Sequence, residues 1–386
     1  MTEFLSYGKQ WIDEDDIQNV LSTLSSNFLT QGPRISEFEQ ALCQCTGARY
    51  CVVVANGTAA LHLAVAALGI ERDAEGITST NSFAASANAL IYNDIKPVFT
   101  DIDRQTYLLD INDLEKRITS RTRLFLPVHF AGQPIEMKKI KSLSTRHRCA
   151  VIEDAAHALG SHYDDGSPVG NCKYSDMTIF SFHPVKTITC GEGGAITTND
   201  QALYEKLLLL RNHGITRDAA QLKENPGPWY YEMQMLGFNY RLTDLQAALG
   251  LSQLKKLDYF VKRRREIINR YNKAFAKTEW LTTPFEQKGV LSAFHLYVLK
   301  IDFKKIKFSR RQVMETLKTK NIGSQVHYIP IHTHPYYQQR YHYHWGDYPV
   351  AEHYYEQALS IPLYPKLTDD QVQYVIDAIL ELPHAK

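Results

Sequence analysis

One lysine of this sequence lies where an amine could act as a nucleophile. Lys186 follows the apolar run of residues 177–180 and precedes the glycine-rich segment Gly191-Glu192-Gly193-Gly194. A lysine just past the end of a strand and beside a glycine-rich turn can be partly desolvated, which lowers the pKa of its amine and makes the amine a nucleophile toward an aldehyde. Taken alone, the motif also fits an ordinary surface lysine.

Two adjacent carboxylates end another apolar run. Glu153 and Asp154 follow residues 149–152 directly. A buried carboxylate without a partner costs several kcal/mol, so at least one of the two must meet a cation or a hydrogen-bond donor. The pair by itself fits a salt bridge, a helix N-cap, or a carboxylate that keeps a pyridinium nitrogen protonated.

A third segment, Asn56-Gly57-Thr58, could bind an anion. It lies between the apolar run Val52-Val53-Val54 and a helix-favouring stretch at residues 59–68. A helix that begins at the carboxyl end of a buried strand presents free N–H groups and the positive end of its dipole. Gly57 lets the backbone approach a phosphate, and the Thr58 hydroxyl can donate to it. The sequence has no GxGxxG or GxxxxGK[ST] motif, so neither a Rossmann fingerprint nor a P-loop is supported.

These segments must be positioned by alternating strands and helices. Short apolar runs separated by amphipathic segments between residues 50 and 200 predict an α/β fold with a mostly parallel sheet. We expect a large domain with an N-terminal arm at residues 1–245 and a smaller C-terminal α/β domain at 246–386. The predicted strands are 50–54, 97–99, 124–128, 149–152, 177–180, 195–197, 291–301 and 324–328; the predicted helices are 14–24, 59–68, 309–318 and 369–382, with further helix over 242–276.

Composition excludes several classes of protein. The 386 residues carry 43 Lys and Arg against 42 Asp and Glu, a formal net charge of +1, so no overall field attracts nucleic acid or an anionic membrane. The N-terminus lacks the basic and apolar regions of a secretory signal, so we expect a cytoplasmic protein. The longest uncharged run, residues 50–70, is interrupted by Asn56-Gly57-Thr58 and His62 and is interpreted as strand, turn and helix.

Cysteine and histidine patterns argue against a metal site. The six cysteines form no CxxC pair, which favours free thiols in a reducing compartment. Histidines gather in the C-terminal part but have no acidic or cysteine partner at ligand spacing, so we expect no metal. Because tyrosines are interleaved with them, we expect an aromatic surface at a ligand site or a dimer contact. The histidines are His327, His332, His334, His342, His344 and His353, and the tyrosines are Tyr336, Tyr337, Tyr341 and Tyr343.

The order of a phosphate turn, an acid and a lysine 32 positions later resembles the fold-type I enzymes that use pyridoxal 5'-phosphate (PLP). Local motifs resemble the DegT/DnrJ/EryC1/StrS sugar aminotransferase family, and the resemblance covers essentially the whole chain. The matching segments are Leu29-Thr30-Gln31-Gly32-Pro33, Asn56-Gly57-Thr58-Ala59-Ala60-Leu61, Glu153-Asp154-Ala155-Ala156-His157-Ala158-Leu159-Gly160, Ser181-Phe182-His183 through Lys186 with Gly191-Glu192-Gly193-Gly194, Gly237-Phe238-Asn239-Tyr240-Arg241, and Val326-His327-Tyr328.

The resemblance implies a role for each matching residue. Lys186 would bind the cofactor covalently and later act as the acid and base of the reaction, and Asp154 would pair with the pyridine nitrogen. Asn239 would reach the phosphate of the neighbouring subunit's cofactor, which implies a homodimer with shared active sites. The phosphate would be held by Gly57, Thr58, Ala59 and Ser181, and the ring would be stacked by Phe83.

Two positions refine the resemblance. Many family members carry Gln where this sequence has His157, and a histidine can make the same hydrogen bond to the cofactor's 3-hydroxyl. Some members replace the lysine with histidine and catalyse dehydration, so Lys186 argues for transamination. His183, three residues upstream of Lys186, is not that replacement.

Further segments resemble the branch of this family that serves pseudaminic acid synthesis. They are Leu251-Ser252-Gln253-Leu254-Lys255-Lys256, Gln325-Val326-His327-Tyr328-Ile329-Pro330-Ile331 and His157-Ala158-Leu159-Gly160-Ser161. The resemblance implies transfer of an amine from L-glutamate to C4 of a UDP-linked 2-acetamido-2,6-dideoxy-4-keto-hexose. The implied substrate contacts are Tyr7, His183, Arg241, His327 and Tyr328.

Two alternatives to this assignment stay open at this point. The first is an aminotransferase for another nucleotide-linked 4-keto or 3-keto sugar, of the perosamine or bacillosamine type. The second is a regulator that binds PLP without turnover. The combined presence of Lys186, Asp154 and the phosphate turn argues against the regulator, because a binding module has no need of a nucleophilic amine.

Overall fold

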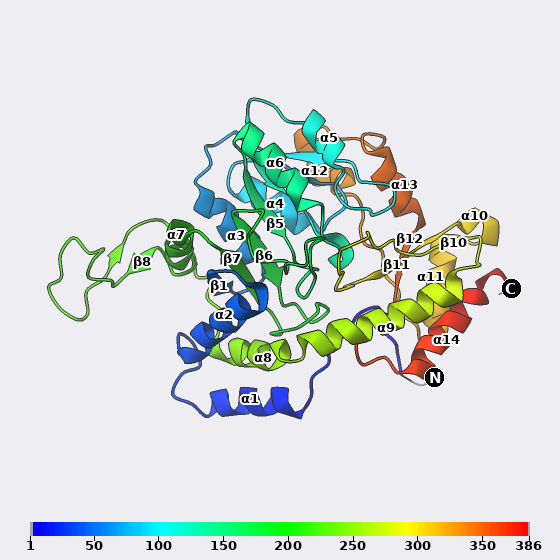
Figure 1. Ribbon diagram of the computed structural model, residues 1–386, viewed down its shortest axis with the longest axis horizontal. Coiled ribbons are helices and arrows are strands. Elements are labelled where there is room, and N and C mark those ends of the chain that lie inside the picture. The colour runs from blue at the N-terminus through cyan, green and yellow to red at the C-terminus, as the bar shows by residue number, and fades with distance from the viewer. Residues whose placement is uncertain (1–2, 385–386) are drawn as a thin grey trace.

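The computed structural model describes residues 3–384, and a seven-stranded sheet forms its centre (Figure 1). All its strands run parallel except β7, which is antiparallel to both of its neighbours. In spatial order the strands are β1 (Tyr50–Val54), β7 (Gly194–Thr198), β6 (Met177–Ser181), β5 (Ala150–Asp154), β4 (Thr122–Leu126), β2 (Glu75–Ser79) and β3 (Lys96–Thr100). The carboxyl ends of the parallel strands therefore share one edge of the sheet, as expected for an α/β fold.

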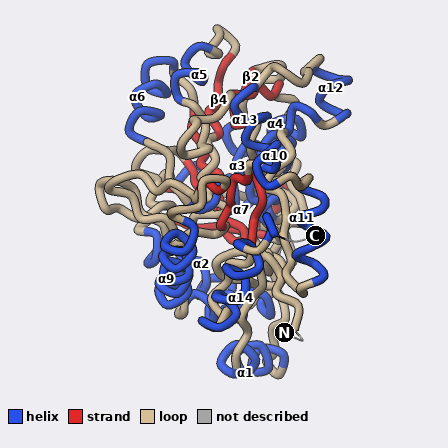
Figure 2. The backbone as a smooth tube through the Cα atoms, turned by 90° about the vertical axis from the view of Figure 1, so that its right-hand side faces the viewer, coloured by secondary structure: helices blue, strands red, loops and turns tan. Residues whose placement is uncertain are grey.

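Both faces of this sheet are buried, because alternate side chains of each strand enter different cores. On β1, Val52 and Val54 join one apolar cluster, whereas Cys51 and Val53 join the other. Figure 2 shows the strands in the middle of the molecule, with α6 on one side and α4 on the other. The first cluster is covered by α3 (Gly57–Leu68), α4 (Ala84–Tyr92) and α7 (Gln201–Arg211), and the second by α2 (Pro33–Thr46), α6 (Met137–His147) and α8 (Asp244–Leu254).

A second, antiparallel sheet builds a smaller core near the C-terminus. Its strands are β10 (Leu281–Thr282), β11 (Tyr297–Ile301) and β12 (Ala358–Ile361). The long helix α9 (Leu257–Phe275) runs from the large sheet region to this core (Figure 1) and contributes Ile267, Tyr271 and Phe275 to it. Helices α10 (Phe303–Ile306), α11 (Arg310–Thr319) and α14 (Asp369–Leu380) complete this part. The predicted domain boundary after residue 245 stays a prediction.

The remaining elements extend or connect these two parts. Helix α1 (Glu14–Leu24) packs on α8, and its buried Asp16 accepts a 2.6 Å hydrogen bond from Gln253 Nε2. The pair β8 (Ile215–Thr216) and β9 (Glu232–Met233) forms an arm that projects from the body (Figure 1). Shorter elements are α5 (Ile111–Lys116), α12 (Pro335–Tyr341), α13 (Pro349–Gln357) and the 3-10 turns Phe130–Gly132, Ile331–Thr333 and Leu382–His384.

One strand of the large sheet is absent from the prediction, and two predicted strands differ from the structure. Strand β2 was not predicted, since its sequence Glu-Gly-Ile-Thr-Ser has no apolar run; Gly76 lies under Leu90, where a Cβ would come within 2.6 Å of Leu90 Cδ2. Residues 324–328 form no strand, and only Gln325 bridges to Ser360. The strand predicted at 291–301 is restricted to β11.

Some of the tyrosines near the C-terminus pack in the core instead of lying on the surface. Tyr337 is buried, and it packs with Tyr343 and Tyr348 around Phe99 of β3. The expectation of an aromatic surface is therefore wrong for Tyr337. None of the helices within residues 3–384 is both long enough and apolar enough to cross a membrane.

Candidate active site

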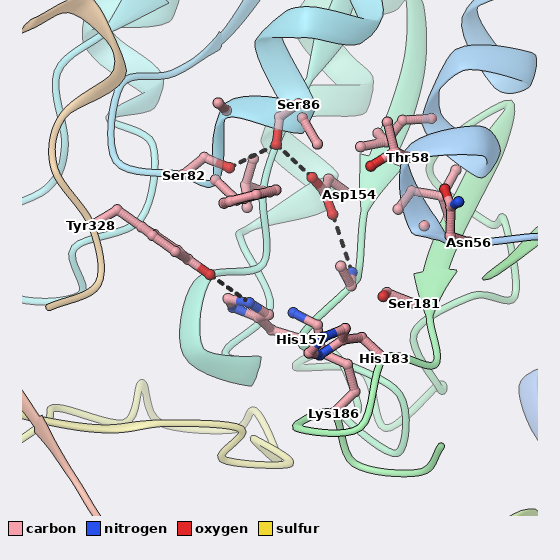
Figure 3. Close-up of a pocket in the computed structure, with 18 of the residues that line it drawn as sticks. Asn56, Thr58, Ser82, Ser86, Asp154, His157, Ser181, His183, Lys186 and Tyr328 are labelled. Carbon is pink, nitrogen blue, oxygen red and sulfur yellow. Dashed lines mark hydrogen bonds between the residues drawn. The ribbon is translucent and has the colours of Figure 1, made fainter. Parts of the chain in front are cut away.

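A cavity of about 1200 Å³ opens at the carboxyl ends of β1, β5 and β6 (Figure 3). Segments far apart in the sequence meet there, because parallel strands deliver their following loops to one edge of the sheet. Residues 325–329 and 334 close it from the C-terminal part. Twelve of the sequence-predicted site residues line it: Tyr7, Gly57, Thr58, Ala59, Phe83, Asp154, His157, Ser181, His183, Lys186, His327 and Tyr328.

The predicted phosphate turn has the geometry of an anion site. Asn56 caps α3, and its Oδ1 accepts a 2.8 Å hydrogen bond from the Ala59 amide. The N–H groups and the positive dipole end of this twelve-residue helix face the cavity. Ser181 lies so close that a Cβ on Gly57 would stand 2.8 Å from Ser181 Cβ. The glycine is therefore required for the strand end and the helix start to meet.

Asp154 points into the cavity, and its carboxylate is held by two donors (Figure 3). Ser86 Oγ donates to Oδ2 at 2.6 Å, and the Ala156 amide donates to Oδ1 at 3.1 Å. Ser82 Oγ is 2.7 Å from Ser86 Oγ, and it donates to that oxygen because the Ser86 proton is directed to Asp154. These two hydrogen bonds fix the orientation of the Asp154 carboxylate, so it is presented to the cavity in one geometry.

Glu153 serves a different purpose from its neighbour, because adjacent strand residues face opposite sides of the sheet. It is fully buried away from the cavity. His129 Nδ1 accepts from the Ile135 amide, so its Nε2–H donates to Glu153. Burial opposes the charge of Glu153, but hydrogen bonds outweigh burial and lower its pKa. The donors are His129 at 2.7 Å, Tyr163 at 2.6 Å, Ser175 at 2.5 Å and Thr178 at 3.2 Å.

Lys186 has the properties of a reactive amine. Burial lowers its pKa from 10.5 to about 8, although the charge of Asp154 opposes this shift. No hydrogen bond or ion pair joins its Nζ to another of the residues 3–384. A turn closed by the Lys186 amide and the His183 carbonyl, 2.9 Å apart, directs this residue back toward the strand ends. The amine is thus poised to lose its proton near neutral pH.

His157 is held in one neutral tautomer. Burial, followed by the charges of Lys186 and His327, lowers its pKa well below the ordinary value. Its Nδ1 accepts a hydrogen bond from the Ala131 amide at 3.2 Å, so the proton of the neutral ring is on Nε2. Nε2 lies 3.1 Å from Tyr328 Oη and therefore donates to it. The hydroxyl proton of Tyr328 is then free to be donated into the cavity.

Phe83, Tyr7 and His327 also line the cavity. Phe83 is 61% exposed although it is a large apolar side chain, as expected of a group that covers a ligand. Tyr7 packs on His327, with ring centroids 5.1 Å apart. Burial and then the charge of Lys186 lower the pKa of His327 to about 3, and its Nδ1 is 2.7 Å from Ser360 Oγ. Tyr7 and His327 are neutral, so they can form hydrogen bonds with a ligand but cannot bind a phosphate by charge.

Two predicted site residues, Asn239 and Arg241, lie outside this cavity. Arg241 Nη1 donates to Asn212 Oδ1 at 2.5 Å and faces a separate hollow. Asn239 is exposed and bridges to Asn212. Only the intervening Tyr240 faces the cavity of its own chain. Among the described residues that line the cavity, Lys186 is the single lysine and there is no arginine.

The six C-terminal histidines do not converge. His332 is buried, with Nδ1 2.6 Å from Thr80 Oγ1 and Nε2 2.9 Å from Glu352 Oε1. His327 and His334 line the cavity, whereas the other three lie elsewhere. Within residues 3–384, no three His, Cys, Asp or Glu side chains are grouped as metal ligands would be. All six cysteines are free.

Several residues of the site were missed by sequence reasoning. Ser82 and Ser86 are four residues apart, a spacing that places them on one helix face, but nothing in the sequence names Asp154 as their acceptor. His295 is buried beside His157, with ring centroids 4.3 Å apart and no hydrogen-bond partner for Nδ1. No local signal could reveal this pair, because the two histidines are 138 positions apart in the sequence.

A mostly parallel sheet with a phosphate-type turn after β1, a carboxylate at the end of β5 and a buried lysine after β6 defines a fold-type I PLP-dependent transferase. The chain belongs to the DegT/DnrJ/EryC1/StrS aminotransferase family, whose model matches residues 10–380. It is 42% identical over 380 residues to the spore coat polysaccharide biosynthesis protein SpsC of Bacillus subtilis, covering 98% of this chain and 97% of SpsC. An uncharacterized protein of Methanocaldococcus jannaschii is also 42% identical, over 379 residues, with the same coverage of the two chains.

Solved structures are similar over the full length. PseC of Helicobacter pylori, an aminotransferase involved in the biosynthesis of pseudoaminic acid, superposes with a TM-score of 0.91 at 34% identity, covering 99% of this chain and 100% of PseC. A sugar aminotransferase from Streptococcus pneumoniae, solved in a PLP form, superposes with a TM-score of 0.90 at 28% identity, covering 99% of both chains. The family and these neighbours make this protein a sugar aminotransferase.

Proposed function

We propose that the protein uses PLP to transfer an amino group from L-glutamate to C4 of a UDP-linked 2-acetamido-2,6-dideoxy-4-keto-hexose, for pseudaminic acid synthesis in the cytoplasm. The observation that carries the reaction type is Lys186, whose pKa is lowered to about 8 in a cavity shared with Asp154 and the start of α3. The similarity to PseC and the segments around His157, Leu251 and His327 support the choice of sugar.

The residues of the cavity fit PLP at each end. The N-terminus of α3 with Ser181 suits a phosphate, and the anion of Asp154 suits a protonated pyridine nitrogen. Phe83 is exposed to cover the ring. His157 can donate its Nε2 proton to the 3-hydroxyl oxygen in place of Tyr328 Oη, its partner in the free site. Bound PLP supplies an aldehyde for amines and a ring that withdraws electrons from the attached carbon.

The protein's own contribution centres on proton movement at Lys186 Nζ. A neutral amine attacks an aldehyde, and the same amine, once released, can move a proton between a substrate carbon and the cofactor. It would take a proton from the donor's carbon in the first half of the reaction and give one to the sugar's carbon in the second. Its pKa of about 8 leaves both protonation states populated near neutral pH. Asp154, held in place by Ser86 and the Ala156 amide, would pair with the pyridine nitrogen and so support the ring as an electron sink.

The scarcity of cations in the cavity supports a homodimer with shared sites. A sugar diphosphate carries negative charges that Lys186 alone does not offset, and Arg241 and Asn239 face away from their own cavity. We infer that both residues enter the cavity of the second subunit, where Asn239 holds the cofactor phosphate and Arg241 the substrate diphosphate. Tyr7, His183, His327 and Tyr328 would contact the sugar from the first subunit.

Subunit sharing can be tested by complementation. Lys186→Ala and Arg241→Ala variants should each be inactive as homodimers. When the two are unfolded and refolded together, hybrid dimers form that contain one intact shared site, so activity should return. If the mixture stays as inactive as its components while hybrid dimers are detected by mass, Arg241 acts on its own subunit and the shared site is refuted.

The substrate assignment is tested by incubating the protein with glutamate and a panel of UDP-, GDP- and dTDP-linked 4-keto sugars, with product structure determined by NMR. Amination of the UDP-linked 2-acetamido sugar, with an axial amine at C4, supports the proposal. Preference for a GDP-linked sugar would identify a perosamine-type enzyme, and an equatorial amine at C4 a bacillosamine-type enzyme.

A non-catalytic PLP-binding regulator is the second candidate, because the groups that suit the cofactor could hold it without turnover. The two are separated by the visible absorption band of the purified yellow protein. An aminotransferase should lose this band when glutamate is added and regain it with a keto sugar. A band that responds to no amino donor would support the regulator. Lys186→Ala should hold cofactor without turnover, and Asp154→Ala should weaken the electron sink.

A further inference from the structure

A further cavity, of about 410 Å³, is separate from the active site and is lined by basic and aromatic side chains. We call it the rear cavity; it shares no lining residue with the active-site cavity. Its walls come from the loop before α5, from β11 and from α13. The lining residues are Arg104, Tyr107, Lys300, Pro349, Val350, His353 and Tyr354.

The charges of the rear cavity are not balanced by acids. Neither Arg104 nor Lys300 forms a hydrogen bond or ion pair with a carboxylate of residues 3–384. Lys300 is about half buried, and burial lowers its pKa; its Nζ lies 5.2 Å from the Tyr107 ring centroid. A cation that is partly desolvated without an acid partner is unusual, and an anionic ligand supplies that partner.

The neighbouring carboxylates pair with neither cation, although burial and then the charge of Asp103 raise the pKa of Tyr107 in the cavity wall. Asp103 accepts hydrogen bonds from the Thr106 amide and hydroxyl, at 2.8 and 2.9 Å. Asp101 accepts from the amides of Val350 and Ala351 at the start of α13, at 3.0 and 2.8 Å. Glu356 is 3.9 Å from His353 Nδ1 and faces that ring alone. The rear cavity therefore presents Arg104 and Lys300 without an ion pair, together with the imidazole of His353.

The floor of the rear cavity is joined to the active site. Tyr354 packs on Tyr107, with ring centroids 4.5 Å apart, and Tyr354 Oη donates to the His327 carbonyl at 2.8 Å. On the other side, the Tyr107 carbonyl accepts from Asn81 Nδ2 at 3.2 Å. Asn81 Oδ1 in turn accepts from the Tyr328 amide at 3.4 Å. Tyr354 thus contacts the segment that carries His327 and Tyr328 directly, and Tyr107 is linked to that segment through Asn81.

We propose that the rear cavity binds a small phosphate monoester, which acts on the active site through Tyr354. A phosphate group matches the forked donor of Arg104 and the point charge of Lys300, and the rings of Tyr107 and Tyr354 provide an apolar surface for the ester group. A ligand that contacts Tyr354 alters the hydrogen bond from Tyr354 Oη to the His327 carbonyl. His327 lines the part of the active-site cavity where we expect the sugar to bind, so the change reaches the substrate. Binding of the phosphate monoester is independent of the proposed function. Its effect on the reaction rests on the proposed function.

Binding is tested by calorimetric titration of the PLP-loaded dimer with phenyl phosphate, and with inorganic phosphate for comparison. Loss of one charge-assisted contact should weaken binding at least about tenfold in Lys300→Met and in Arg104→Gln. Lys304→Met is the matched control, because Lys304 is exposed on α10 and lines neither cavity. Absence of binding, or equal affinity in Lys300→Met and the unaltered protein, overturns the site.

Coupling is tested by Tyr354→Phe, which keeps the aromatic floor and removes only the bond to His327. Phenyl phosphate should change KM for the keto sugar in the unaltered enzyme and leave KM unchanged in Tyr354→Phe, while both bind phenyl phosphate equally. Binding without any effect on KM, or an effect that persists in Tyr354→Phe, overturns the regulatory role. If the sugar reaction itself is absent, the calorimetric result still decides whether the site exists.

Discussion

The low pKa of Lys186 should cost the cofactor-free protein stability, and a lysine-to-methionine variant exposes that cost. In the unfolded chain the amine has a pKa near 10.5, whereas in the folded chain burial lowers it to about 8. At about 1.4 kcal/mol per pKa unit, the difference amounts to about 3 kcal/mol. Lys186→Met has a side chain of similar shape and no charge, so it escapes this penalty.

The stability penalty of the buried Lys186 amine changes with pH in a defined direction. Below pH 8 the amine is protonated in both states, and the full penalty destabilises the folded state. Between pH 8 and 10.5 the folded state loses its proton first, so the unaltered protein gains stability as pH rises. Above 10.5 both states are neutral and the penalty vanishes. The advantage of Lys186→Met should therefore fall from about 3 kcal/mol at pH 7 to nearly zero at pH 10.5.

Urea unfolding of the two cofactor-free proteins at a series of pH values measures this difference. Groups that lie away from Lys186 titrate equally in both proteins and cancel. Lys304→Met controls for the exchange itself at an exposed site, where surface substitutions change stability by about 0.5 kcal/mol or less. An advantage for Lys186→Met that is absent at pH 7, or one that persists unchanged to pH 10.5, refutes the assignment of a buried amine with a lowered pKa.

Three shorter predictions concern residues around the site. Ser86→Ala removes one of the two donors to Asp154, so the affinity for PLP should fall about tenfold, while Ser86→Thr should retain it; fluorescence titration measures both. Gly57→Ala brings a Cβ within 2.8 Å of Ser181 Cβ, so PLP should be lost readily on dialysis, and retention at the unaltered level would contradict the close approach. Glu153→Gln disturbs a fully buried network of four donors, so unfolding free energy should fall by about 3 kcal/mol; equal stability would show that the charge of Glu153 contributes little.

Sequence alone determined the fold class and much of the site, because both depend on local patterns. Predicted strands at 50–54, 177–180 and 195–197 coincide with β1, β6 and β7, and the helix predicted at 14–24 is α1. The order of turn, acid and lysine placed Gly57, Asp154 and Lys186 at strand ends, and parallel strands bring such ends to one edge.

Tertiary structure decided what no local pattern contains. β2 forms because its position between β3 and β4 satisfies its backbone, although its sequence has little apolar character. Asp154 faces the cavity and Glu153 faces the buried network, because adjacent strand residues point to opposite sides of the sheet. Each is held there by donors up to 68 residues away in the sequence. Arg241 turns away from the cavity that its motif suggested. Such features depend on distances between segments that are far apart in the sequence. Packing sets these distances, and local residue types and spacing do not encode them.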